Sequence, residues 1–344
     1  MAGTHSRVPP LSPPAPGAPA PPRPRVAWSW STAALGALDV LPAVVVTPFD
    51  VTLGLALGFG VLPVALLGVL PTRLGRVRAI PVGVLMGLSI LLGSLVSDLH
   101  VVAVVAIFGL AVGAALLVER RPVGQLALTL AVPMVGIGLS FTDHAKGVAL
   151  FLLIAVGTVY AYLVSLLWPE RDAPPTVRAP EPPGGAMLDY GIRFGIAGAT
   201  AAALGFAFDV DHVGWQVAAA MLVMRPAAEM QRLRSVGRIV SVVVGAFLAA
   251  GMAAAQPAAG WYAVAIAVAV VGAAATQGSR WYVTPAFTTF IAISLLLYGH
   301  PHDVAYRFDQ RVVETLVGVG IAYCFGLLVP RVQARLRRPS RQES

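Results

Sequence analysis

Acidic side chains inside otherwise apolar stretches are the residues of this sequence with the most distinctive chemistry. Asp39 and Glu314 both lie within such stretches. If these stretches cross a membrane, burying a carboxylate costs about 3 kcal/mol or more, so an acid there is typically functional or paired. Arg311 precedes Glu314 by one helical turn, which favours an ion pair between them. We predict proton coupling at Glu314 and Asp39, with ion pairing or an interfacial position as the alternative.

Three arginines are candidates for an anion path, because anion passage needs positive charge near a pore. Arg225 and Arg238 flank a turn that also holds Arg232 and Arg234, between two apolar runs. Arg76 stands seven residues before a glycine, as Arg238 does. The alternative interpretation is that Arg225, Arg238 and Arg76 only orient the chain and contact phospholipid headgroups.

Aromatic and hydroxyl side chains could complete a site for an organic ligand. Tyr162 and Tyr323 occupy matching positions in two similar segments and could stack on an aromatic substrate. Thr288 follows Pro285, which interrupts an apolar run and frees backbone groups next to the threonine hydroxyl. Helix packing is the alternative role for all three.

The composition indicates that these residues are positioned by membrane helices. The chain has 344 residues, of which 57% are hydrophobic and only 12% are charged, and its mean hydropathy is +0.79. Soluble domains carry about 25% charged residues. The net charge of +8 comes almost entirely from arginines next to apolar runs, so we predict no nucleic-acid partner.

Twelve apolar runs predict about twelve transmembrane helices in an all-α polytopic fold. We divide the chain into a disordered Pro-rich tail (1–27), a first membrane unit (28–168), a cytoplasmic linker (169–187), a second membrane unit (188–330) and a basic tail (331–344). The runs lie at about 28–46, 51–70, 79–97, 99–118, 123–141, 146–168, 189–208, 213–225, 236–255, 260–277, 283–299 and 308–329.

The basic residues alternate between the ends of these runs. If each apolar run crosses the membrane once, 21 of the 24 basic residues lie in the two tails or at run ends on the same side as the tails. The run ends on the other side hold only Lys146, Arg307 and Arg311. Positive charge marks cytoplasmic loops. We therefore predict a multi-pass protein of the cell (plasma) membrane with both termini in the cytoplasm.

The two membrane units resemble each other in sequence. The pattern GxxxAYxxxLLxP occurs from Gly157 and again from Gly318, and Phe-Asp-Val occurs at 49–51 and at 208–210. Near-constant offsets at separated places indicate duplication. Because six spans return the chain to its starting side, the sequence predicts two parallel six-helix repeats.

The segment from Trp215 to Gly245, with Arg225, Pro226 and Arg238, resembles the fusaric acid resistance protein-like family, as does Arg311-VV-Glu314-Thr315-LV-Gly318. That family is related to aromatic acid exporters and aluminium-activated malate transporters. The resemblance implies export or conduction of organic anions, often aromatic carboxylates.

We therefore predict an integral membrane transporter that exports small organic (aromatic carboxylate) anions, with proton coupling as one option. A passive anion channel and a non-transporting membrane scaffold stay open as alternatives. The expected partners are membrane lipid and the organic anion, and a homo-oligomer is compatible with the sequence. No nucleotide-binding, catalytic or metal-ligand motif is present, so we predict no enzyme activity, no cofactor and no metal.

Overall fold

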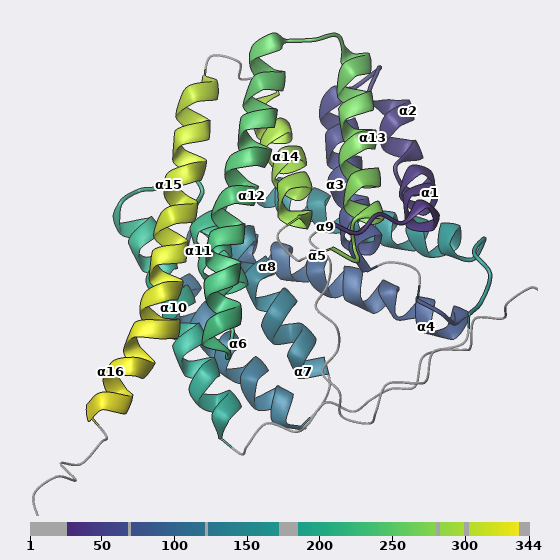
Figure 1. Cartoon of the computed structure of the whole chain (residues 1–344). Coiled ribbons are helices and arrows are strands. Elements are labelled where there is room, and N and C mark those ends of the chain that lie inside the picture. The colour runs from purple at the N-terminus through teal and green to yellow at the C-terminus, as the bar shows by residue number, and fades with distance from the viewer. Residues whose placement is uncertain are drawn as a thin grey trace, which may run out of the picture.

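The computed structural model describes residues 26–67, 70–120, 123–171, 185–279, 283–298 and 303–336. Over these residues every regular element is a helix (Figure 1). The predicted Pro-rich tail, linker and basic tail fall largely outside the described residues, so their boundaries stay predictions.

The helices follow the predicted apolar runs. The first half contains α1 (Trp30–Asp39), α2 (Leu41–Val46), α3 (Val51–Leu67), α4 (Arg73–Val77), α5 (Ala79–Leu95), α6 (His100–Arg120), α7 (Val123–Leu126), the π-helix η1 (Ala127–Ala131), α8 (Val132–Gly138) and α9 (His144–Ser165). The second half contains α10 (Ala186–Ala207), α11 (Val213–Val223), α12 (Ala228–Ala255), α13 (Ala259–Ala275), α14 (Thr284–Leu297), α15 (Val304–Tyr323), the π-helix η3 (Cys324–Leu328) and α16 (Val329–Leu336).

Five helical stretches of the described residues are long and apolar enough to cross a membrane. They are Arg73–Leu95, His100–Val118, His144–Ser165, Ala228–Ala255 and Val304–Gln333. Shorter apolar helices accompany them at Val51–Leu62, Gly124–Gly138, Val213–Val223, Ala259–Ala275 and Thr284–Leu297. These helices fit the predicted helical membrane protein, whereas the count of about twelve spans stays a prediction.

Prolines explain where several runs are interrupted. Pro42 stands in the first turn of α2, and Pro285 stands in the first turn of α14, where a missing N–H costs nothing. The π-helices η1 and η3 each end two residues before a proline, Pro133 and Pro330. A proline lacks the N–H of the helical ladder and crowds the preceding turn, and a widened π turn relieves that crowding.

The helices pack into two main cores that mix segments from both halves. One core joins α6, α10 and α11 through residues such as Ile107, Phe194 and Met221. The other joins α3, α13 and α14 through Leu55, Ile266 and Ile291. In Figure 1 the N-terminal helix α1 accordingly lies beside α13, far from it in sequence.

Arg76 of α4 holds the segment before α5 against the end of α9. Its side chain is only 2% exposed. Its Nε donates to the carbonyl oxygen of Leu70 at 2.9 Å, and its Nη1 donates to those of Ser165 at 2.6 Å and Trp168 at 2.8 Å. Its Nη2 donates to the carbonyl oxygen of Pro169 at 2.8 Å. These contacts favour a structural role for Arg76, and its predicted contact with a substrate anion stays a prediction.

Replacing Arg76 should therefore weaken the fold. We expect Arg76→Gln to lower the free energy of unfolding by about 1–3 kcal/mol, because buried carbonyl groups lose their donors. The thermal unfolding midpoint of the detergent-solubilised protein measures this loss. Arg78→Gln is the matched control, since Arg78 is exposed two residues away. Equal midpoints for the two variants would contradict the structural role.

Candidate functional site

Close packing of α11 against α15 brings the site together. Gly318 of α15 lies directly against the backbone of α11 at Gln216, and an added Cβ there would lie 2.5 Å from the Gln216 carbonyl oxygen. Only a glycine allows this approach. As a result, Trp215 and Gln216 of α11 lie beside the turn of α15 that carries Arg311 and Glu314.

Arg311 is buried between these helices with an unusual set of contacts. It is 3% exposed, and its guanidinium lies 4.3 Å from the centre of the Trp215 ring, a cation–π arrangement. Its Nη1 lies 3.8 Å from Oε2 of Glu314, so the predicted ion pair is confirmed. Neither Nε nor Nη1 has a hydrogen-bond partner among the described residues.

Glu314 is equally buried and is incompletely partnered. It is 3% exposed, and its Oε1 accepts no hydrogen bond from the part of the chain that the structure describes. A buried carboxylate that lacks hydrogen bonds is costly to keep charged. Glu314 therefore combines one weak ion pair, at 3.8 Å, with one free oxygen.

Arg238 of α12 is the second buried arginine of this site. It is 7% exposed, and its charge is close enough to that of Arg311 for the two guanidinium groups to repel each other. Within the described ranges it forms no ion pair, and its buried Nε has no hydrogen-bond partner. We call Arg238, Arg311 and Glu314 the buried charge cluster.

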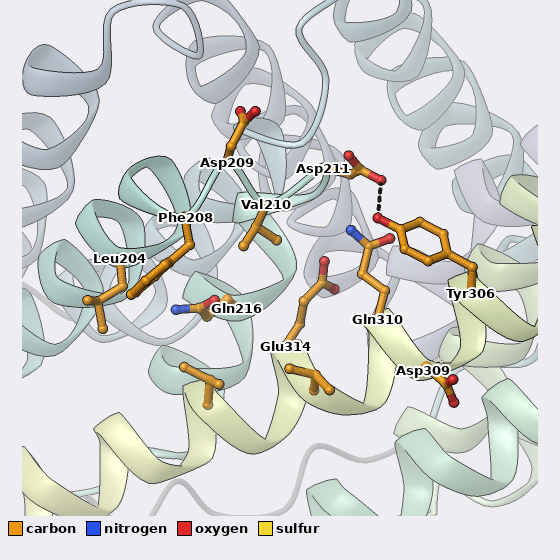
Figure 2. A pocket seen from close by; sticks show the side chains of 12 residues that line it. Leu204, Phe208, Asp209, Val210, Asp211, Gln216, Tyr306, Asp309, Gln310 and Glu314 are labelled. Carbon is orange, nitrogen blue, oxygen red and sulfur yellow. Dashed lines mark hydrogen bonds between the residues drawn. The ribbon is translucent and has the colours of Figure 1, made fainter.

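A pocket of about 440 Å³ opens next to this cluster (Figure 2). Glu314 projects into it between Gln216 and Gln310, and apolar side chains such as Phe208 form its other wall. At its rim, Asp211 accepts a hydrogen bond from the Tyr306 hydroxyl at 3.2 Å and pairs with Arg307 at 3.4 Å. The remaining carboxylates of the lining are Asp209 and Asp309.

His212 lies at the same end, between α10 and α11. Burial lowers its pKa to about 4, and the neighbouring positive charge of Arg307 acts in the same direction, whereas Asp211 opposes them. His212 is therefore neutral at physiological pH and adds no positive charge to the site.

Arg225 lies at the other end of α11. Its Nη1 donates to the carbonyl oxygen of Met224, which also accepts from the Tyr190 hydroxyl at 3.1 Å. The Arg225 backbone N–H donates to Oε1 of Gln231 at 3.4 Å. Burial lowers the pKa of Arg225, and Tyr190 opposes this shift. Arg225 thus closes the turn between α11 and α12, apart from the buried charge cluster.

The other predicted residues lie apart from the cluster. Asp39 is 1% exposed at the end of α1, and neither carboxylate oxygen has a hydrogen-bond partner in the described part of the chain. Tyr162 lies on α9 and Tyr323 on α15, and these helices pack mainly against different neighbours. The Thr288 hydroxyl donates to the carbonyl oxygen of Pro285 at 3.2 Å.

Two of the predicted residues, Glu314 and Arg238, thus lie in the same buried charge cluster. The cluster and its surroundings also contain residues that were not predicted. Arg311 and Trp215 were not predicted as ligand-binding residues, although the spacing of Arg311 and Glu314 indicated their pair. Sequence reasoning also missed the pocket, whose lining comes from the end of α10, the α10–α11 loop, the start of α11 and α15. No local pattern marks residues that converge only through helix packing.

Comparison with known proteins finds a family whose pattern covers this region. Residues 200–325 match the family model described as fusaric acid resistance protein-like. This finding confirms the resemblance that the sequence predicts, and the matched segment contains Trp215, Arg238, Arg311 and Glu314. The chain matches no curated protein and no solved structure.

The neutral state of His212 makes stability depend on pH. Because the unfolded chain binds a proton near pH 6.5 and native His212 does not, the free energy of unfolding should fall as the pH drops below 6.5. We expect this histidine to contribute a loss of about 1 kcal/mol between pH 7 and pH 5.5. Thermal unfolding of the wild type and of His212→Gln across this range measures it. The same pH dependence in both proteins would refute the assignment.

Proposed function

We propose that this protein, which matches the fusaric acid resistance protein-like family over residues 200–325, is a transporter that exports small organic anions across a membrane. The observation that carries the proposal is the buried pair of arginines, Arg238 and Arg311. Both have buried nitrogens without hydrogen-bond partners among the described residues. A carboxylate is the ligand that guanidinium donors bind best.

The charge along the bundle supports a direction for transport. Arg225 and Arg232 lie near the start of α12, at the end that we propose faces the cytoplasm. The pocket at the opposite end carries Asp209, Asp211 and Asp309. An anion is attracted to the basic end and repelled at the acidic one, because like charges disfavour approach. This gradient favours loading from the cytoplasm in the plasma membrane.

We also propose that Glu314 couples the export of the anion to the movement of protons. Glu314 touches both the pocket and Arg311, so a proton arriving from the pocket would change the charge beside the anion site. Asp39 is a second candidate, because its buried carboxyl has no hydrogen-bond partner among the described residues. The path of the anion could also include residues that lie apart from the buried charge cluster. These candidates are Tyr162, Tyr323, Thr288, Arg76 and Arg225.

We further propose that about twelve helices form two parallel six-helix repeats. Matching helix pairs support this arrangement. In the first half α9 packs on α3 and α5, and in the second half α15 packs on α11 and α12. Across the halves, α1 packs on α13 as α10 packs on α6. Each helix contact named for one half thus has a counterpart between the matching helices of the other half.

Two alternatives from different classes predict different measurements. A passive anion channel would conduct carboxylates without any response to a proton gradient. A non-transporting membrane scaffold would give no flux. The unpartnered donors of Arg238 and Arg311 favour a protein that binds an anion over a scaffold.

Removing the positive charge of Arg238 should strongly reduce transport. In proteoliposomes loaded with benzoate, we expect Arg238→Gln to reduce efflux by about tenfold or more, because the site loses a charged hydrogen-bond donor worth about 1.5–3 kcal/mol. Arg232→Gln is the matched control, since Arg232 is exposed on the same helix. Equal losses in both variants would indicate a general effect of helix charge and would refute the site.

The role of Glu314 can be separated from anion binding. We expect Glu314→Gln to abolish the part of benzoate flux that responds to an imposed pH gradient and to retain flux driven by the benzoate gradient, because a glutamine carries no titrating proton. Measurement of both fluxes in the same vesicles tests this. Unchanged gradient-driven flux in the variant would exclude proton coupling through Glu314.

A further inference from the structure

We propose that the buried charge cluster selects monovalent organic anions over dianions, and that Glu314 sets this valence. The inference rests on the proposed function, because it assigns the charge of the ligand that Arg238 and Arg311 bind. It goes beyond that function by naming the class of anion and the residue that determines it.

The net charge of the cluster favours a ligand with a single negative charge. Arg238 and Arg311 contribute two positive charges and Glu314 contributes one negative charge, so the cluster carries one net positive charge when Glu314 is ionised. Among the described residues Glu314 is the carboxylate that pairs with Arg311, and none pairs with Arg238. A buried charge without a counter-ion is strongly unfavourable. One monovalent carboxylate supplies the missing counter-ion.

The buried hydrogen-bond donors without partners also fit one carboxylate ligand. The buried Nε of Arg238 and the Nε and Nη1 of Arg311 lack hydrogen-bond partners among the described residues. At 3.8 Å, the contact between Arg311 and Glu314 is too long to be a hydrogen bond, so it occupies none of these donors. A single carboxylate has two oxygens and can accept from both guanidinium groups.

Among the described residues that line or border the pocket, a second negative charge on the ligand would meet no unpaired cation. Toward the pocket, Arg307 already pairs with Asp211, and His212 is neutral. The exposed carboxylates Asp209 and Asp309 line the same pocket and would repel it. Trp215 and Gln216, which α11 contributes, carry no charge. A dianion would therefore leave one buried negative charge uncompensated.

Binding of two matched ligands tests this inference. Benzoate and benzene-1,3-dicarboxylate share one ring and differ by one charge at pH 9, an alkaline pH chosen to keep Glu314 ionised. We expect the purified full chain in detergent to bind benzoate at least about tenfold more tightly, since about 1.4 kcal/mol corresponds to tenfold in affinity. In Glu314→Gln the ratio of dicarboxylate to benzoate affinity should rise at least about tenfold, because the cluster then carries two net positive charges.

A second variant adds the same charge without removing a buried residue. Val317 is 38% exposed, lines the pocket and lies one helical turn from Glu314. Val317→Lys should shift the affinity ratio in the same direction as Glu314→Gln. Asp303→Asn is the matched control, because it neutralises an exposed carboxylate at the start of the same helix. It should leave the ratio unchanged.

The outcomes separate this inference from the proposed function. An unchanged ratio in Glu314→Gln and Val317→Lys, with benzoate still bound, overturns the role of Glu314 in valence and leaves the proposed anion site standing. Failure of the wild type to bind benzoate overturns both. If Glu314→Gln does not remain monodisperse on size-exclusion chromatography, the ratio in Val317→Lys decides the question.

Discussion

The fold of the second half must accommodate the burial of Arg311 and Glu314 within a bundle of apolar helices. Two charges removed from water cost several kcal/mol each, and their mutual attraction offsets this only when the geometry and the remaining hydrogen bonds are good. Here the ion pair is long, at 3.8 Å, and several donors and one acceptor lack partners among the described residues. The arrangement is therefore a poor source of stability, which is an argument that it serves ligand binding.

The surrounding helices reduce that cost without removing it. Trp215 places the face of its ring against the Arg311 guanidinium, which stabilises a cation without neutralising it. Gly318 lets α15 approach α11 closely enough for this contact. The pocket beside Glu314 gives one side of the cluster access to a polar rim. Packing thus holds the charges in place while leaving guanidinium donors available.

The sequence predicts the fold class well because hydrophobic runs and proline breaks are local signals. Helices occur in every predicted apolar run, and the Arg311–Glu314 pair follows from a spacing of one turn. The site was only partly predictable. Arg76 and Arg238 have similar sequence contexts, yet backbone carbonyls surround the guanidinium of Arg76, whereas the buried Nε of Arg238 has no hydrogen-bond partner among the described residues. This difference depends on tertiary packing, which short sequence patterns do not contain.

The proposed duplication sharpens the argument for function. An offset of 161 residues relates Arg311 and Glu314 to Leu150 and Leu153 of α9, so the first half has apolar residues where the second has the charged pair. Leu150 belongs to a packed core there. Replacing a buried ion pair by packed apolar residues is often neutral or stabilising. A fold that accommodates leucines at these positions in one half does not need the charges in the other for packing. The proposed anion site accounts for their presence in α15, where buried guanidinium donors lack hydrogen-bond partners among the described residues.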